Sequence, residues 1–237
     1  NYKGNLRGNK VIFENNDDHN YFLKLNAITE RDSCVIRGAG IEVDRDFKKI
    51  QHKKNKVPVV AVLARMLKDK GINEFVEAAI ILKKKKINAR FLLIGDSDPL
   101  NPSSIKRNTL QTWNNEGKIE WLGWVDNVNQ IIRKVDILCL PSYREGLPKA
   151  LLEGAALGLP LVATNTVGCK DVVIDGINGF LVPVKNSKAL SIALETLIND
   201  SKLRKIMGKE SFKIVSSKFS SSIINSQTMR LYKELTF

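Results

Sequence analysis

A nine-residue segment, Glu145-Gly-Leu-Pro-Lys-Ala-Leu-Leu-Glu153, has residue types and spacing that suit anion binding. Pro148 favours the first turn of a helix, where its missing N–H removes no hydrogen bond. The amides around it would be free at the positive end of the helix dipole, a site that fits a diphosphate. Two carboxylates cannot both bind phosphate, so we expect Glu145 and Glu153 to bind hydroxyls on either side of it. The predicted ligand-binding residues here are Gly146, Leu147, Pro148 and Glu153.

Two cations follow an apolar run at residues 57–63. Arg65 and Lys70 could neutralise the charge of a diphosphate leaving group. A lone arginine and lysine in a loop are more often surface charges, so this prediction depends on their loop lying beside Glu145. If it does, Arg65, Lys70 and Glu145 are the candidate catalytic residues. Lys68, in the same loop, is expected to face solvent.

Two other loops hold unusual local sequences. Gly95 follows a second apolar run and precedes Asp96 and Asp98, which is either ordinary turn chemistry or a nucleotide contact. Two carboxylates without further ligands are weak support for a divalent metal. Only two histidines are present, which is too few for a histidine-rich site, so we expect no metal. Lys170, in the loop at 164–171, is a further candidate substrate contact.

The elements that must position these residues alternate regularly from residue 57 onward. Strands that are apolar throughout and alternate with helices indicate a parallel sheet covered on both faces, a Rossmann-like doubly wound α/β fold. Such sheets bind ligands at the carboxyl ends of their strands, so the loops after residues 63, 94, 140 and 163 should share one rim. Strands are expected at 57–63, 90–94, 119–122, 137–140, 161–163 and 180–182, and helices at 71–86, 102–116, 127–134, 148–157, 187–199 and 201–217.

The composition fits a globular protein with a basic surface, because 43% of the 237 residues are hydrophobic and the net charge is +13. The three cysteines are far apart and lack metal-ligand spacing, which favours a reduced, cytoplasmic setting. No stretch has the length or pattern of a signal peptide or a spanning helix. The run Lys83-Lys-Lys-Lys86 is either a solvated helix end or a contact for anionic lipid headgroups. Nucleic acid is not expected, since no recognition motif accompanies the charge.

Four motifs, in this order along the chain, resemble those of one enzyme family. They are Arg65 with Lys70-Gly71 after the first strand, Glu145 and Glu153 as an E-x7-E pattern, the run Gly158-Leu-Pro-Leu-Val-Ala163, and the Asp-Gly-x-Asn-Gly turn at 175–179. From about residue 34 onward the chain resembles the C-terminal domain of the family-four retaining glycosyltransferases, which have the GT-B fold of two Rossmann-like domains.

This resemblance implies a role for each residue of the site. The ligand would be a nucleotide sugar, with UDP as the nucleotide. Glu145 would hold hydroxyls of the transferred sugar, Glu153 would hold the ribose, and Arg65, Lys70 and the amides at 146–148 would stabilise the leaving diphosphate. Neither a metal nor another cofactor would be required, and the anomeric configuration would be retained.

Segments 142–149 and 168–171 are similar to those of bacterial enzymes that extend undecaprenyl-diphosphate-linked oligosaccharides. This similarity implies transfer of a hexose or N-acetylhexosamine to a lipid-linked saccharide, in surface polysaccharide or glycan assembly, at the inner face of the cell membrane. Two departures stand out. Gly154 replaces the alanine of those relatives, and Lys170 stands where they often carry arginine.

The ends of the chain do not follow the alternating pattern. A strand is expected at 10–13 and helices at 18–26 and 220–235. By resemblance, residues 1–36 would be the remnant of an N-terminal acceptor domain, 37–218 the nucleotide-sugar-binding domain, and 219–237 a helix that crosses back to the first domain. The chain alone would then bind donor weakly and transfer nothing.

Two functions of other classes remain open at this point. A sugar-nucleotide epimerase of GT-B architecture would share the fold and the ligand, but it needs acid and base groups near the sugar. A non-catalytic module would bind acidic partners through the basic surface. It would bind no nucleotide, and it would not depend on Glu145 or Glu153.

Overall fold

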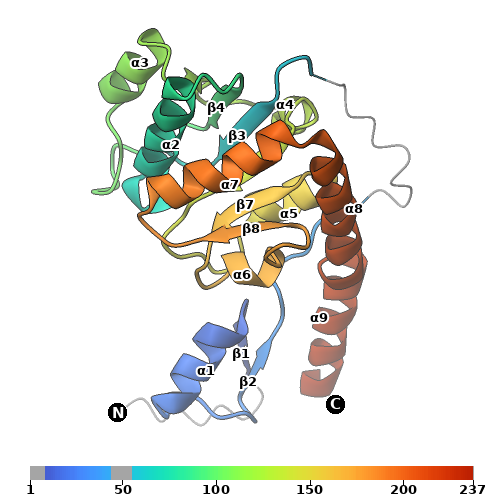
Figure 1. The fold of residues 1–237 in the computed structure, drawn as a ribbon. Helices are drawn as coiled ribbons and strands as arrows, with labels where there is room; N and C mark the ends of the chain where they lie inside the picture. The colour runs from blue at the N-terminus through green and yellow to red at the C-terminus, as the bar shows by residue number, and fades with distance from the viewer. Residues whose placement is uncertain (1–8, 44–54, 237) are drawn as a thin grey trace.

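The computed structural model describes residues 9–43 and 55–236, and its centre is a six-stranded sheet (Figure 1). Each pair of neighbouring strands is parallel, which confirms the predicted sheet. The strands lie in the order β5-β4-β3-β6-β7-β8. They are β3 (Val59–Leu63), β4 (Arg90–Ile94), β5 (Glu120–Trp121), β6 (Ile137–Leu140), β7 (Leu161–Thr164) and β8 (Gly179–Val182).

Helices cover both faces of this sheet, so the doubly wound fold is also confirmed. Val60 and Val62 of β3 point to the face that α2 and α7 cover, while Val59 and Ala61 point to the face that α5 and α8 cover. In Figure 1, α7 lies in front of the sheet and α5 behind it. The helices are α2 (Ile72–Lys84), α3 (Arg107–Asn115), α4 (Val128–Ile132), α5 (Lys149–Ala156), α6 (Cys169–Val172), α7 (Ser187–Asn199) and α8 (Ser201–Lys218), with the 3-10 helix η2 (Lys68–Lys70) before α2.

The strand order places a switch point at the centre of the rim. Numbered along the chain, the six strands run 3-2-1-4-5-6, so the direction of winding reverses between β3 and β6. The loops after these two strands therefore leave the sheet towards opposite faces, and ligands of such sheets bind where they part. Arg65 and Lys70 follow β3, and Glu145 follows β6. The fold therefore brings the loop with Arg65 and Lys70 next to the loop with Glu145, as predicted.

A smaller unit lies below this domain in Figure 1. It contains β1 (Val11–Phe13) and β2 (Ser33–Val35), which pair in parallel, with α1 (Asn16–Lys24) between them along the chain. The last helix, α9 (Ser221–Thr236), continues beyond α8 and packs Ile224 and Leu231 against Ile36, directly after β2. The C-terminal helix thus contacts the N-terminal unit. The assignment of residues 1–36 to an acceptor domain stays a prediction.

Two passages of chain connect the units, and they lie side by side. The amide of Ile41 donates to the Phe219 carbonyl at 2.9 Å, and the amide of Ser221 donates to the Ile41 carbonyl at 2.9 Å. Within the described residues, no helix is both long enough and apolar enough to cross a membrane.

One helix begins later than predicted, because α3 starts at Arg107 and not at residue 102. The amide of Ile105 donates to Met66 O at 2.8 Å, and the amide of Lys68 donates to Ser103 O at 2.8 Å. Pairing with the loop after β3 therefore overrides the helix-start signal that proline and serine give. Strand β2 and helix α6 were not predicted, and His52 lies outside the described residues.

Candidate functional site

Lys70 and Glu145 meet across the switch between β3 and β6. The Lys70 Nζ lies 2.6 Å from Glu145 Oε1 and 2.8 Å from Oε2. Gly71, with φ 70°, ends η2, and a Cβ there would lie 2.0 Å from the Pro141 carbonyl oxygen. Only glycine lets the two loops approach this closely. Both side chains are largely enclosed, with 22% of Lys70 and 12% of Glu145 exposed. The pair therefore places a cation and a carboxylate at the switch between β3 and β6.

The loop that carries Glu145 is fixed from two sides. The Tyr143 amide and the Ser142 hydroxyl both donate to the Asp69 carbonyl, at 2.8 and 3.2 Å. The Tyr143 hydroxyl donates to Glu74 Oε1 at 2.7 Å. Burial and this hydrogen bond raise the pKa of Tyr143 well above its ordinary value, so the phenol stays protonated and remains a donor. Sequence reasoning missed this tether, since nothing in the order of residues links Tyr143 to Glu74.

Helix α5 begins with amides that have no acceptor among the described residues. Its N-cap is Pro148, without a side-chain cap, and the N–H groups of Gly146, Leu147 and Lys149 are likewise unbonded there. Four amides at a helix start lack intrahelical partners, and they attract anions together with the helix dipole. The anion site stays a prediction, and the amides that would form it begin at Gly146, directly after Glu145 in the chain.

Arg65 and Gly95 lie on the β4 side of the rim. They line a cavity of about 560 Å³ together with Leu63, Ile94 and Trp124. The Arg65 Nη1 pairs with Asp98 Oδ2 at 2.9 Å, so its charge faces this cavity and not Glu145. The Trp124 indole is 77% exposed. The cavity therefore offers apolar walls and one paired cation.

Glu153 lies on the other side of α5. It lines a second cavity, of about 610 Å³, with Lys149 and Arg133. The Lys149 Nζ is 3.7 Å from Glu153 Oε1. Burial raises the pKa of the Glu153 carboxyl, and Lys149 offsets part of that rise. Glu153 therefore lines a cavity whose lining does not include Glu145.

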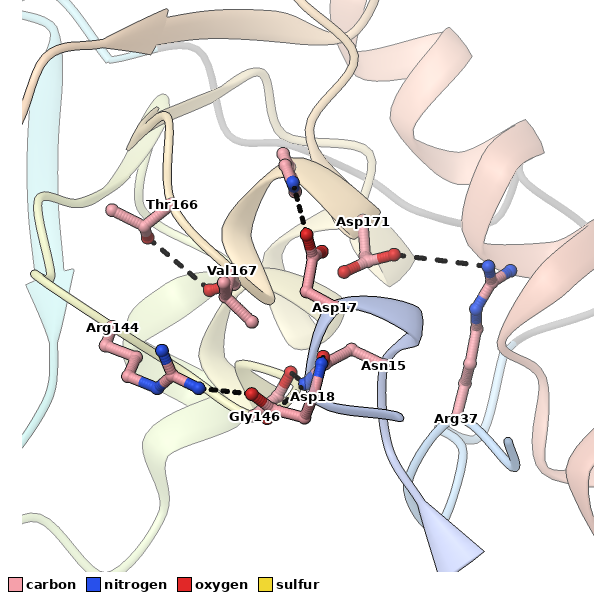
Figure 2. Close-up of polar contacts among 10 residues, drawn as sticks. Asn15, Asp17, Asp18, Arg37, Arg144, Gly146, Thr166, Val167 and Asp171 are labelled. Carbon is pink, nitrogen blue, oxygen red and sulfur yellow. Dashed lines mark hydrogen bonds and ion pairs between the residues drawn. The ribbon is translucent and has the colours of Figure 1, made fainter. Parts of the chain in front are cut away.

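Lys170 is directed towards the N-terminal unit. Its Nζ lies 2.8 Å from Asp17 Oδ1, at the start of α1, where Figure 2 labels Asp17. Next to it, Arg144 pairs with Asp18, and Asp171 lies 4.0 Å from Arg37. The prediction of a ligand contact at Lys170 is untested, but the structure gives this ammonium group another partner. Sequence reasoning missed the acidic start of α1, which lies more than a hundred residues away along the chain.

Metal-ligating side chains and the Cys169 thiol are the other groups to consider for chemistry among the described residues. Among residues 9–43 and 55–236, no group of three or more histidine, cysteine, aspartate or glutamate side chains could hold a metal ion. Asp96 and Asp98 pair with Arg107 and Arg65. Burial raises the pKa of the Cys169 thiol to about 11, so this thiol stays protonated and unreactive near neutral pH.

Comparison with known proteins agrees with this geometry. The profile of the family described as "Glycosyl transferases group 1" matches residues 43–214. An N,N'-diacetylbacillosaminyl-diphospho-undecaprenol alpha-1,3-N-acetylgalactosaminyltransferase of Campylobacter jejuni is 32% identical over 92% of this chain and 58% of its own length. The capsular polysaccharide biosynthesis glycosyltransferase CapM of Staphylococcus aureus is 28% identical over 86% and 56%. The chain thus spans a little over half the length of these relatives.

Solved structures share the fold at lower sequence identity. A glycosyltransferase from Rickettsia africae superposes with a TM-score of 0.81 and 22% identity, over 97% of this chain and 64% of that one. Anabaena HepE, crystallised in complex with UDP, superposes with a TM-score of 0.80 and 20% identity, over 95% and 64%. The profile match covers most of the chain and the fold is that of GT-B enzymes, so the chain belongs to the group 1 glycosyltransferases.

Proposed function

We propose that this chain binds a nucleotide sugar along the rim, with the diphosphate at the start of α5. The observation that carries the proposal is the set of unbonded amides at 146–149 directly beside the Lys70–Glu145 pair. A diphosphate there would accept these N–H groups, and Lys70 would neutralise charge on the leaving group. Glu145 would hold hydroxyls of the transferred sugar, and Glu153 would hold the ribose.

The cavity beside β4 is the proposed place for the base. Gly95 has φ 132°, and a Cβ there would lie 2.0 Å from the Ala64 carbonyl oxygen, so the backbone of this loop runs close to its neighbour. Arg65 would reach the diphosphate by leaving Asp98, which costs little because the Arg65 side chain is exposed. Lys170 would have to release Asp17 before it could contact the donor. UDP is the proposed nucleotide, and it is the one named in the HepE complex.

In the whole protein, the proposed reaction transfers a hexose or N-acetylhexosamine to a lipid-linked saccharide, with retention. The relative from Campylobacter jejuni and an alpha-1,3-galactosyltransferase of Escherichia coli are both named for diphospho-undecaprenol acceptors. The acceptor would bind outside this chain, because the chain spans only part of these relatives. On its own, the chain would therefore bind donor without transferring sugar.

We also propose contact with the inner face of the membrane, where such acceptors would be held. Of the basic run at 83–86, Lys83 donates to Gly117 O and Lys85 pairs with Glu195 at 2.5 Å. Lys84 and Lys86 are exposed and have no ion pair within the described residues. These two lysines support a weaker attraction to anionic headgroups than the full run would give.

The two alternatives have less support. The named relatives above are transferases, and nothing among the described residues favours an epimerase. A non-catalytic module that binds acidic partners would leave the open amides of α5 and the enclosed Lys70–Glu145 pair without a role.

Calorimetric titration of a panel of UDP-sugars and GDP-mannose into this chain tests the proposal. We expect one or more UDP-sugars to bind, and Arg65→Ala and Glu153→Ala to weaken that binding about tenfold, as the loss of one charged hydrogen bond predicts. Lys68→Ala is the matched control, because Lys68 is an exposed cation in the loop of Arg65 and Lys70. A panel without any binding sugar, or variants that bind as the parent does, would overturn the assignment.

A further inference from the structure

One side chain of the N-terminal unit reaches the backbone of the proposed phosphate site. Asn15 is fully buried and precedes α1 as its N-cap, where its Oδ1 accepts the Asp18 amide at 2.8 Å. Its Nδ2 donates to Asp18 Oδ2 at 2.9 Å and to the Gly146 carbonyl at 3.1 Å. Figure 2 shows Asn15 and Asp18 packed over Gly146. Capping of α1 requires only the bond from the Asp18 amide to Asn15 Oδ1, so capping does not account for the bond to Gly146.

The bond to Gly146 fixes the direction of one of the open amides. A trans peptide is planar, and its C=O and N–H point in opposite directions. When the Gly146 carbonyl points to Asn15, the Leu147 N–H must point away from α1, towards the rim.

The surrounding groups leave this peptide little freedom to turn. A Cβ on Gly168, which has φ 78°, would lie 2.6 Å from the Gly146 oxygen and 2.7 Å from the Glu145 oxygen. On the other side, a Cβ on Gly146 would lie 2.5 Å from Glu14 Oε2. The Gly146 peptide is thus enclosed between the start of α6 and the start of α1. Both enclosing segments contribute to its orientation, and Asn15 supplies the polar contact.

Two ion pairs hold the start of α1 at this position. Asp18 pairs with Arg144 in the Glu145 loop, and Asp17 pairs with Lys170 of α6 at 2.8 Å. The Glu145 loop and the start of α6 are therefore both joined to the start of α1. Movement of α1 away from the domain would release the Gly146 carbonyl and both loops together.

We propose that Asn15 is a positioning residue for the donor diphosphate: it orients the Gly146–Leu147 peptide so that its N–H faces the phosphate. This inference rests on the proposed function and adds a residue from outside the nucleotide-binding domain to its site. It also predicts coupling between the units, because a donor that binds the oriented amides favours the docked position of α1.

The test compares Asn15→Ser and Asn15→Asp with the parent. Serine and aspartate both remain good N-caps, but neither can donate an N–H to the Gly146 carbonyl. Serine is neutral, so it separates the lost donor from the added charge of aspartate. Asn186→Ser is the matched control, because Asn186 caps α7 through the Ala189 amide at 2.8 Å, away from the rim.

Calorimetry with UDP and ligand-observed NMR with uridine give the readouts. We expect Asn15→Ser to weaken UDP binding about fivefold, the effect of one neutral hydrogen bond, and to leave uridine binding unchanged. Asn186→Ser should change neither. General damage to the site would weaken both ligands alike, so equal losses would contradict a role in phosphate positioning. A loss seen with Asn15→Asp alone would also contradict it, since that result is a charge effect.

A second measurement does not depend on affinity. In the unliganded chain labelled with 15N-leucine, the Leu147 amide resonance should shift in Asn15→Ser and stay in place in Asn186→Ser. An unmoved resonance would overturn the inference. If the parent binds UDP and Asn15→Ser binds it equally well, the inference fails and the proposed function stands. If the parent binds no UDP, the proposed function fails first.

Discussion

Lys70 and Glu145 form an ion pair, and this pair determines what a donor must do on binding. The contacts between the Lys70 Nζ and the two Glu145 carboxylate oxygens, at 2.6 and 2.8 Å, hold the cation in place. A diphosphate would share Lys70 with Glu145 and would not need to recruit it from solvent. The site is therefore preorganised, which is the condition under which charge stabilisation lowers a barrier most. The ion pair of Glu153 is longer, because the Lys149 Nζ lies 3.7 Å from Glu153 Oε1.

A pH dependence follows for Glu153. Burial raises the pKa of its carboxyl, so the folded state binds this proton more tightly than the unfolded state does. The contribution of Glu153 to stability therefore falls as the pH rises from the ordinary carboxyl pKa through the raised one. Glu153→Gln should remove this decline in thermal unfolding measured between pH 4 and 7. Binding of a UDP-sugar should strengthen over the same window in the parent, because the ribose needs the carboxylate.

Glu120 is the control for this prediction, because the pH dependence of its contribution to stability has the opposite sign. The hydrogen bond from Arg90 lowers the pKa of Glu120, so the contribution of Glu120 to folding stability is present above the ordinary carboxyl pKa and is lost as the pH falls.

For the binding measurement, a UDP-sugar is the appropriate ligand, because its esterified diphosphate lacks the terminal ionisation near about pH 6 of a free phosphate. If Glu153→Gln left the pH profiles of stability and binding unchanged, burial of that carboxyl would not be the cause.

At the scale of elements, close packing of α5 on the sheet explains a departure from the family pattern. Gly154 lies in α5, and a Cβ there would lie 2.4 Å from Leu138 Cδ2 and 3.2 Å from Leu138 Cβ, on β6. The alanine that related enzymes carry at this position would not fit against leucine at 138. Glycine lowers helix propensity by about 1 kcal/mol, but in the second half of α5 it lets the helix lie directly on β6.

Gly154→Ala should therefore destabilise the chain, although alanine is the better helix former. We expect a loss of about 1–3 kcal/mol in the free energy of unfolding, the usual cost of overpacking a core. Leu138→Val should relieve the contact, so the double variant should lose less than the sum of the two single variants. Denaturation in guanidinium chloride measures all three. Additive losses would show that the two side chains do not compete for space.

The elements that could be predicted are those whose signal is local. β4, β6 and α7 match their predicted bounds, because an apolar run or a helical period identifies each within its own residues. The elements that were missed depend on tertiary contacts. The residues before α3 pair with the loop after β3, while β2 is three residues long and α6 four. At the site, Lys70 beside Glu145 follows from strand order, but the bond from Asn15 to Gly146 links residues that no local pattern connects.

At the scale of the whole molecule, charged contacts join the N-terminal unit to the loops after β6 and β7. Arg144–Asp18 and Lys170–Asp17 cross between the units, and Arg37–Asp171 joins the connection after β2 to α6. Exposed pairs of this kind contribute little each and are screened by salt. The docking of α1 should therefore be adjustable, while the two apolar cores of the nucleotide-binding domain stay intact.

A charge exchange tests this docking. Lys170→Asp and Asp17→Lys should each speed hydrogen exchange of the α1 amides, because each removes a pair and juxtaposes like charges. The double variant should recover most of the protection, with a coupling energy of about 0.5–1 kcal/mol. Amides of α7 are the internal control, and added sodium chloride should speed exchange in α1 alone. A double variant that exchanges as fast as the single ones would show that this pair does not hold α1.

The paired passages at Ile41 and Ser220 have a consequence for engineering. The chain enters the larger domain and leaves it at one point, where the two passages are hydrogen-bonded to each other. A domain whose two ends touch can be inserted into a loop of another protein, or circularly permuted, without stretching either end. The larger domain therefore has a single attachment point, at the paired Ile41 and Ser220.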